Sequence, residues 1–430
     1  MSEYFSRKWA GLEPYVPGEQ PRDAQYVKLN TNESPYPPSP VVTEEALSRL
    51  RSLNLYPDPT YTELRESLAR VLTERSGAAI RPQNITVGNG SDEILNWAFA
   101  AFCDEGCPAM FADITYGFYP VFAANNRVPY VIAPLDEAFC IRVEDYCQLT
   151  RKTVFIANPN APTGRALALA DIERIVAANA GNVVVVDEAY VDFGAESAVS
   201  LVPRYPNLLV TQTFSKSRSL AGGRLGFAVA QAPLIADLET LRNSTNPYNV
   251  NNATVAWAVA TLAHDDIVRS KCALVMRTRA MVAGALEALG FYVVPSSTNF
   301  LFVRHPLLAG ETIYRELKAR GVLVRHFTAP RISEFNRITV GTRAQMDVLL
   351  VALEDILAAA GAAATPRVIL SERSESKDLG ADAPHVDAGA SSGALLPFAG
   401  TRALLVEDNA VNQEIMLMIL VESKGSGGLS

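Results

Sequence analysis

The sequence is poor in the residues that build metal centres and disulfide frameworks. Its 430 residues include five cysteines and four histidines, and the cysteines form no CxxC motif. We therefore expect free thiols, with neither a disulfide-stapled fold nor a metal site. Apolar runs of the roughly 18 residues that span a membrane are missing too. The N-terminal MSEYFSRKWAGLEPY lacks the apolar core of a secretory signal. These absences predict a cytoplasmic protein without a membrane partner.

The chain also lacks an excess of basic residues. Lysine and arginine number 38 against 46 aspartates and glutamates, which gives a formal net charge of −8. Because binding to a nucleic-acid backbone relies on positive charge, we expect no nucleic-acid partner. The hydrophobic fraction of 49% and the charged fraction of 20% are those of a globular protein, which excludes a wholly disordered chain.

Short apolar runs and amphipathic stretches follow one another through the first two thirds of the chain. Runs of strand length that are apolar on both faces are typical of buried strands in a parallel sheet. Their alternation with helical stretches predicts an α/β fold with a doubly wound, mostly parallel sheet. The expected strands are residues 85–90, 109–113, 153–159, 182–190, 207–215 and 226–230. The expected helices are residues 42–52, 61–77 and 93–102, and Gly77 should end the second of them.

Composition divides the chain into an arm, two domains and a tail. The arm is rich in proline and glycine, and the tail begins with a polar, aperiodic stretch typical of a disordered linker. Further along, the tail contains ALLVEDNAVNQEIMLMIL, which resembles the start of a response-regulator receiver domain, with Glu407 and Asp408 as its acidic residues. From Leu405 to Ser430 there are 26 residues, which are too few for a receiver core. The expected boundaries are 1–45 for the arm, 46–265 for a large domain, 266–362 for a smaller α+β domain and 363–430 for the linker and truncated receiver-like fragment.

Two segments that follow expected strands could bind a phosphate and a ring. Because ligands bind at the carboxyl ends of strands in open α/β sheets, such segments could share one pocket. GNGSDE at 88–93 offers backbone N–H groups and a serine hydroxyl to a phosphate. Taken alone, a serine-capped helix is the simpler interpretation. In NPNAPTG at 158–164 the Asn158 amide could bond a ring oxygen, although a structural turn explains this loop as well.

Two further segments place a charge beside a buried strand. Asp187 follows four valines, and burying its carboxylate requires a cation. The pyridinium nitrogen of pyridoxal phosphate is such a cation, a structural arginine is the alternative, and Tyr190 would reach the same ring. Lys216 is flanked by hydroxyls and could form an imine with an aldehyde, whereas an isolated lysine is usually a surface charge. Together the four segments predict a pyridoxal-phosphate site.

The motifs around these residues resemble those of the fold-type I aminotransferases, and within them the histidinol-phosphate aminotransferases. The likeness to the fold rests on NPNAPTGR, VVDEAY and TFSKSRSLAGGRLGF. The histidinol-phosphate branch is indicated by LEPYVPGEQP and VKLNTNESPYPPSP, and the chain also contains the matching motifs LYPDP and RITVGT. The resemblance covers roughly residues 5–360. It implies a mostly parallel seven-stranded sheet flanked by helices, a smaller α+β C-terminal domain, and transamination between L-histidinol phosphate and 2-oxoglutarate in histidine biosynthesis.

The resemblance also implies a role for each matching residue. Lys216 would be the Schiff-base lysine that moves the proton, and Asp187 would pair with the ring nitrogen. Asn158 and Tyr190 would hold the 3-oxygen of the ring, and Tyr116 would stack on the ring face. The phosphate site would consist of Gly90, Ser91, Asp92, Thr213, Ser215 and Arg224.

The resemblance further implies a shared active site and an anion site. Tyr56 would reach the phosphate from a neighbouring subunit, so we expect a homodimer. One site must accept both the phosphoester of histidinol phosphate and the carboxylate of the 2-oxo acid, which suits a planar guanidinium. Arg325 and Arg337 match the anion-binding arginines, with Tyr36 and Asn32 as further substrate contacts, although both arginines could be ordinary strand-end residues.

Three alternatives remain open. An aromatic aminotransferase or an amino-acid-phosphate decarboxylase would use the same fold and cofactor, and fold-level analogy does not separate them. A pyridoxal-phosphate-binding regulator or a signalling fusion is the alternative that is not an enzyme. The negative net charge and the incomplete receiver argue against it.

Overall fold

The chain forms two compact units, residues 1–371 and 372–430. The computed structural model describes residues 2, 4–6, 12–13, 18–21, 24–50, 53–147 and 149–361, and the backbone of 396–398 and 401–403. In the second unit the described backbone is a hairpin of β14 (Leu396–Phe398) and β15 (Thr401–Ala403). The rest of the predicted linker and the receiver-like fragment lie outside the described residues.

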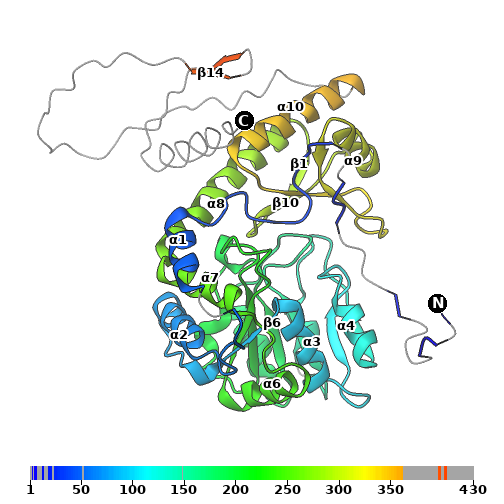
Figure 1. Ribbon diagram of the computed structural model, residues 1–430. Helices are drawn as coiled ribbons and strands as arrows, with labels where there is room; N and C mark the ends of the chain where they lie inside the picture. Colours follow the sequence, from blue (N-terminus) through cyan, green and yellow to red (C-terminus); the bar gives the residue numbers. More distant parts are fainter. Residues whose placement is uncertain are drawn as a thin grey trace, which may run out of the picture. The chain divides into compact units, whose positions relative to one another are not determined.

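A seven-stranded sheet forms the centre of the first unit and confirms the predicted α/β class (Figure 1). Its strand order is β2-β8-β7-β6-β5-β3-β4, and all strands run in one direction except β8, which is antiparallel to both neighbours. Each predicted strand is present in this sheet, although the direction of β8 was not foreseen. The strands are β2 (Ile85–Gly88), β3 (Ala109–Ala112), β4 (Tyr130–Ala133), β5 (Thr153–Ala157), β6 (Val184–Asp187), β7 (Leu208–Thr213) and β8 (Gly226–Ala230).

Helices cover both faces of this sheet, and successive strand residues alternate between the two covers. In β6, Val184 and Val186 belong to a core with α2, α5 and α7, whereas Val185 belongs to a core with α3, α4 and α6. The alternation turns Asp187 toward the α4 side, where it meets a tyrosine of that helix. The helices are α1 (Pro40–Arg49), α2 (Thr62–Ser76), α3 (Ser91–Phe102), α4 (Tyr119–Asn126), α5 (Leu169–Ala178), α6 (Ala232–Thr245) and α7 (Asn252–Ala263).

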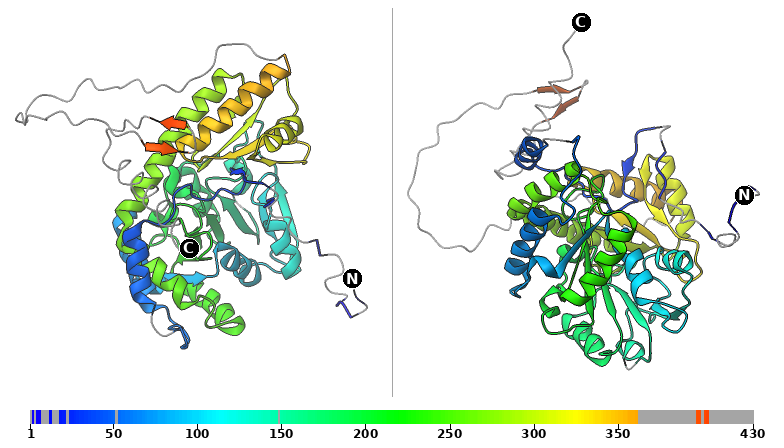
Figure 2. Two further views of the ribbon diagram at one scale, coloured as in Figure 1. Left: turned by 45° about the horizontal axis from the view of Figure 1, so that its top comes forward. Right: turned by 60° about the horizontal axis from the view of Figure 1, so that its bottom comes forward.

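A smaller antiparallel sheet follows along the chain, with strand order β12-β13-β10-β9 (Figure 2). Its core includes residues of the long helix α8 and of α9 and α10. The N-terminal arm adds β1 to β11 as a parallel pair, so part of the predicted arm is tied to this region. The elements are β1 (Val27–Lys28), α8 (Asp265–Ala288), β9 (Tyr292–Val294), β10 (Phe300–Arg304), α9 (Gly310–Ala319), β11 (Val322–Leu323), β12 (Arg325–His326), β13 (Asn336–Thr339) and α10 (Arg343–Ala359).

Helix ends agree with the sequence signals in part. Gly77 ends α2 in the left-handed region at φ +68°, as predicted. The expected serine cap of α3 is wrong. Gly90 occupies the N-cap at φ +82°, and Ser91 is the first helical residue without a capping hydrogen bond from its side chain. Space is tight on both sides of this turn, because a Cβ on Gly90 would stand 2.7 Å from the Arg224 guanidinium and a Cβ on Gly226 of β8 would overlap the backbone of Gly90 and Ser91.

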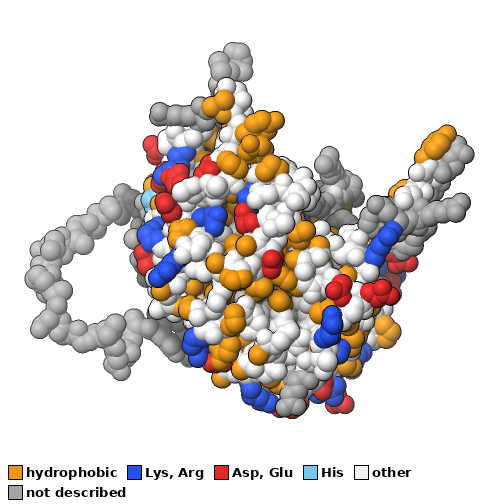
Figure 3. Space-filling view, turned by 90° about the horizontal axis from the view of Figure 1, so that it is seen from below, with side chains coloured by type: hydrophobic (Ala, Val, Ile, Leu, Met, Phe, Trp, Pro, Cys, Tyr) orange, Lys and Arg blue, Asp and Glu red, His pale blue; other side chains and the backbone are white. Residues whose placement is uncertain are grey.

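The surface mixes charges of both signs. On the face shown in Figure 3, basic and acidic side chains are interspersed among hydrophobic ones. Among the described residues, every helix is too short or too polar to span a lipid bilayer.

Candidate active site

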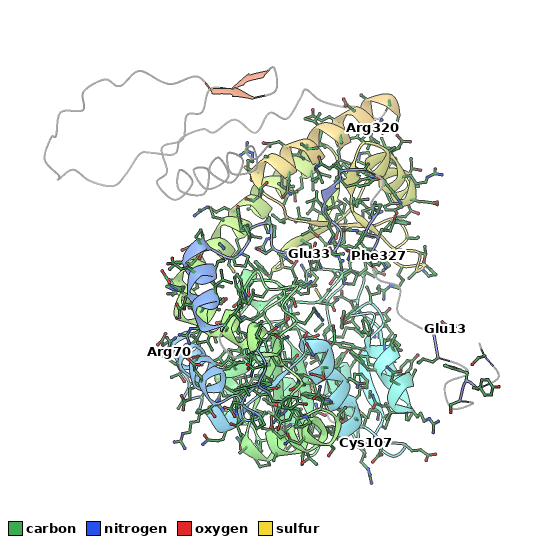
Figure 4. The ribbon with its side chains drawn as sticks, in the orientation of Figure 1. Glu13, Glu33, Arg70, Cys107, Arg320 and Phe327 are labelled. Carbon is green, nitrogen blue, oxygen red and sulfur yellow. The ribbon has the colours of Figure 1, made fainter. Side chains whose placement is uncertain are left out.

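The predicted site segments surround one cavity of about 110 Å³ at the carboxyl ends of β5, β6 and β7. The start of α3 and the turn before α4 close its other sides. Figure 4 shows Glu33 and Phe327 at the level where the large sheet region meets the smaller one. The predicted residues that line the cavity are Ser91, Asp92, Tyr116, Asp187, Tyr190, Thr213, Ser215, Lys216 and Arg224.

Asp187 is buried at the last position of β6. Its carboxylate accepts hydrogen bonds from the hydroxyls of Tyr119 at 3.1 Å and Thr211 at 3.2 Å, not from the structural arginine considered as an alternative. Burial raises the pKa of Asp187 to about 6, although both hydroxyls oppose the change. A cation that entered the cavity would therefore meet a carboxylate that no positively charged side chain pairs with in the described part of the chain.

Asn158 follows β5 and is also buried. Its Oδ1 accepts a hydrogen bond from the backbone N–H of Leu167 at 2.8 Å, which fixes the direction of the amide. Its Nδ2 is buried and has no hydrogen-bond partner among the described residues. A buried donor without an acceptor is costly, so this nitrogen is ready to bond a ligand oxygen.

Lys216 and Tyr190 meet beside residues 30–32 of the arm. The Nζ of Lys216 donates to the carbonyl oxygen of Thr31 at 3.2 Å and lies 5.7 Å from the centre of the Tyr190 ring. The Tyr190 hydroxyl accepts a hydrogen bond from Nδ2 of Asn32 at 3.0 Å. Asn32 is buried at φ +56° and also bonds Thr339 of β13, so the arm links the two sheets at this point.

Four predicted phosphate-site residues, Gly90, Ser91, Asp92 and Arg224, gather at the start of α3 beside Tyr116, the predicted ring-stacking residue. Asp92 accepts hydrogen bonds from the Tyr116 hydroxyl at 2.6 Å and from Arg224 at 3.2 Å. Burial and the Asp92 carboxylate raise the pKa of Tyr116 well above its ordinary value, so this hydroxyl stays protonated. A Cβ on Gly90 would stand 2.7 Å from the Arg224 guanidinium, so a glycine here leaves room for that group. The N–H groups at Ser91 and the guanidinium form a corner of hydrogen-bond donors that could bind an anion.

Thr213 and Ser215 complete this corner from β7. The Thr213 hydroxyl lies 3.0 Å from the Ser215 hydroxyl and also receives the backbone N–H of Ser215 at 3.1 Å. Arg224 contacts the Ser215 hydroxyl at 3.4 Å. The loop between β7 and β8 is thereby folded back toward the start of α3.

The two predicted anion-binding arginines stand directly opposite each other. Arg325 of β12 and Arg337 of β13 are paired across the antiparallel strands, so their side chains leave the same face of the sheet. Arg337 donates to the carbonyl oxygen of Asn30 at 3.1 Å and lies 5.3 Å from the Phe300 ring. Arg325 and Arg337 lie 6.0 and 5.9 Å from the Phe327 ring. Two guanidinium groups beside aromatic rings can bind an oxyanion.

Seven predicted residues are not part of the cavity lining, namely Gly90, Asn158, Asn32, Arg325, Arg337, Tyr36 and Tyr56. The first five stand beside it or in the neighbouring small sheet, as described above. Tyr36 packs against an apolar cluster that includes Phe193 and Val340, and burial raises its pKa. Tyr56 is 80% exposed and stacks on Tyr248 at a ring distance of 4.5 Å. The exposure of Tyr56 leaves its ring available to a second chain.

Sequence reasoning missed three residues that touch the site. Tyr119 and Thr211 bond Asp187, and Thr31 holds the amine of Lys216. In the TYGFY segment the only signal was a second tyrosine three residues after Tyr116, which a helical period places on the same side.

Comparisons with known proteins identify the family of this chain. The family model described as aminotransferase class I and II matches residues 24–353. The chain is 49% identical over 355 residues to histidinol-phosphate aminotransferase 2 of Thiobacillus denitrificans, covering 82% of this chain and 98% of the relative. It is 48% identical over 359 residues to histidinol-phosphate aminotransferase of Marinomonas sp., covering 83% and 100%. Among solved structures, the chain is similar to the crystal structure of histidinol-phosphate aminotransferase from Sinorhizobium meliloti in complex with pyridoxal-5'-phosphate. The TM-score is 0.74 at 23% identity, covering 84% of this chain and 99% of that one, which shows a shared fold.

Proposed function

Because this chain belongs to the class I and II aminotransferases, within the histidinol-phosphate aminotransferases, we propose that it transfers the amino group of L-histidinol phosphate to 2-oxoglutarate. The products are imidazole-acetol phosphate and L-glutamate, and the reaction serves histidine biosynthesis in the cytoplasm. The observation that carries the proposal is the identity of 48–49% to enzymes named for this substrate, over almost their whole length.

Pyridoxal 5'-phosphate is the cofactor, and residues in and beside the cavity fit its groups. The Nδ2 of Asn158, which lacks a hydrogen-bond partner among the described residues, can donate to the 3-oxygen of the ring. Among the described residues the side-chain partners of Asp187 are hydroxyls and not an arginine, so its carboxylate can pair with a protonated ring nitrogen. The start of α3, Thr213, Ser215 and Arg224 provide N–H, hydroxyl and guanidinium donors for the phosphate.

The residues divide the chemical work among them. When bound, pyridoxal 5'-phosphate supplies an electron-poor ring that takes up the electrons released when the substrate Cα loses its proton. The Nζ of Lys216 would hold the aldehyde of the cofactor and would move the proton from the substrate Cα. Asp187 would keep the ring nitrogen protonated, Tyr190 and Asn158 would bond the 3-oxygen, and Tyr116 would cover the ring face.

Substrate selection belongs to the arginine pair. Arg325 and Arg337 leave the same face of the small sheet, and Arg337 is held through Asn30 next to the segment that contacts Lys216. A planar guanidinium accepts a phosphate or a carboxylate in the same orientation, so one site serves both half-reactions. We assign Asn32 and Tyr36 to the same end of the substrate.

We also propose that the active unit is a homodimer. Large apolar side chains are exposed around α1 and the loop after it, and a surface of this kind fits a second copy of the chain. Tyr56 of one copy would then reach the phosphate site of the other. The exposed side chains are Val41, Leu47, Leu53, Leu55, Tyr56 and Tyr248. Light scattering on the purified protein should give twice the mass of the chain, and a monomer with full activity would contradict the shared site.

The half-reaction tests the substrate. Cofactor-loaded protein is mixed separately with histidinol phosphate, phenylalanine, tyrosine and glutamate, and the visible absorbance of the cofactor is followed. We expect histidinol phosphate and glutamate to bleach the absorbance. Bleaching by glutamate and an aromatic amino acid, with histidinol phosphate inert, would replace the proposed substrate and leave the family unchanged.

A further inference from the structure

A buried ion network lies behind the loops that carry Tyr190 and Lys216. Arg75 of α2 pairs with Asp192 at 2.6 Å and with Asp265, the first residue of α8, at 2.5 Å. Asp192 also pairs with Arg218 at 3.3 Å. These four residues, the Asp192 network, have side chains that are at most 20% exposed. Because desolvation offsets much of the attraction in a buried pair, such a network is weak evidence for stability alone.

Asp192 contacts both loops of the proposed site. It lies in the short helix η4 (Val191–Phe193), two residues after Tyr190. Its carboxylate accepts the hydroxyl of Ser217, the residue that follows Lys216, and also receives Arg218. One side chain therefore fastens the turn after β6 to the turn after β7.

The carboxylate is held in its charged form. Burial raises the pKa of Asp192, but the guanidinium groups of Arg218 and Arg75 and the Ser217 hydroxyl outweigh burial and lower it below the ordinary value. An asparagine of the same size would keep one acceptor oxygen and lose the charge that both arginines face. The cluster would then contain two guanidinium groups and a single carboxylate, which favours rearrangement of the loops.

We propose that Asp192 is a positioning residue that sets the Lys216 amine against Tyr190. This inference rests on the roles proposed above for Lys216 and Tyr190. Asp192 touches neither residue's functional atoms, and it acts through Ser217 on one side and through the η4 backbone on the other. The distance it controls is the 5.7 Å between the Lys216 Nζ and the centre of the Tyr190 ring.

The chain offers a matched control in Asp265. Asp192 and Asp265 both bond Arg75, and their side chains are 13% and 14% exposed. Asp265 pairs with Arg75 and Arg269, outside the loops that follow β6 and β7. Asp192→Asn and Asp265→Asn should therefore lower the unfolding midpoint similarly, because each removes one carboxylate from the same cluster.

Cofactor binding separates the two variants. We expect Asp192→Asn to raise the dissociation constant for pyridoxal 5'-phosphate about tenfold, because small displacements of reacting groups are costly. The same variant should shift the pH midpoint of the cofactor's visible absorbance, which reports the Lys216 linkage. Asp265→Asn should leave both quantities within about twofold of the wild type. Equilibrium dialysis of the apoprotein and a spectral titration measure them.

A second variant and its control, with smaller structural changes, test the proposal if Asp192→Asn does not fold. Ser217→Ala removes one hydroxyl and keeps all four charges, and we expect the same direction of change with about a threefold weaker cofactor affinity. Ser200→Ala is its control, since that hydroxyl donates to the carbonyl of Ser197 in a neighbouring turn. Equal behaviour of each variant and its control would refute the positioning role. A wild-type protein that binds no pyridoxal 5'-phosphate would instead refute the proposed function on which the role rests.

Discussion

Asp187 accepts a hydrogen bond from the hydroxyl of Tyr119 at 3.1 Å, and both side chains are buried. The bond joins the end of β6 to the first residue of α4, and a second hydroxyl, of Thr211, bonds the other carboxylate oxygen. Two neutral donors do not compensate the burial of a charge, and burial raises the pKa of Asp187 to about 6. Without a cofactor, Asp187 therefore keeps its proton in the folded protein up to a higher pH than in the unfolded chain, where the pKa of an aspartate carboxyl is about 3.9.

This shift predicts how the stability of the apoprotein depends on pH. A carboxyl pKa that is raised by folding favours the fold at low pH, and that contribution is lost as pH rises through about 6. Asp187→Asn removes the titration. As pH rises from 4 to 7, the unfolding free energy of the wild type should fall relative to that of the variant by up to about 3 kcal/mol. Urea denaturation at several pH values measures the difference, and a difference independent of pH would contradict the expectation.

Replacing Lys216 with alanine should remove covalent attachment of the cofactor. Borohydride treatment with added pyridoxal 5'-phosphate should increase the mass of the wild-type protein by one reduced cofactor and leave Lys216→Ala unchanged. Turnover should fall by about 10³-fold or more, because the variant loses the group that moves the proton. Lys271→Ala is the control, since that half-buried lysine of α8 donates to the carbonyl of Pro37. A stable adduct in Lys216→Ala would reject the assignment.

The sequence predicts the residues whose placement is local. Asp187 ends β6, and Asn158 and Lys216 come shortly after β5 and β7, so each lies at the edge of the sheet where ligands bind in open α/β folds. Tyr119 and Thr31 escaped because their contacts join segments 68 and 185 positions apart. No local pattern encodes such a pairing.

Two further features of the fold depend on neighbours that a local pattern does not contain. An apolar run gives no strand direction, so the reversal of β8 could not be read from residues 226–230. The cap of α3 was wrongly assigned for a related reason. Serine is a good N-cap, yet Gly90 occupies that position at φ +82°, where a Cβ would stand 2.7 Å from the guanidinium of Arg224, a residue distant in the sequence.

The arginine pair predicts a change in substrate affinity. Arg337→Gln should raise the KM for histidinol phosphate about tenfold to hundredfold, because a charged hydrogen-bond donor to the phosphate is lost. Arg337→Lys keeps the charge but not the planar fork, so an intermediate KM is expected. Arg304→Gln is the control, an exposed arginine at the end of β10 in the same sheet. Steady-state kinetics with 2-oxoglutarate measure the change, and equal values for Arg337→Gln and Arg304→Gln would contradict this assignment.

The close approach of β8 to α3 predicts opposite outcomes for two glycine replacements. A Cβ on Gly226 would overlap the backbone at Ser91, so Gly226→Ala should cost about 1–3 kcal/mol of unfolding free energy. It should also weaken cofactor binding, because the N–H groups at the start of α3 are displaced. Gly284→Ala lies within α8 with open space around the new methyl group, and it should stabilise the protein by about 0.5–1 kcal/mol. Urea denaturation and dialysis against pyridoxal 5'-phosphate test both variants, and unchanged affinity in Gly226→Ala would show that the start of α3 does not hold the phosphate.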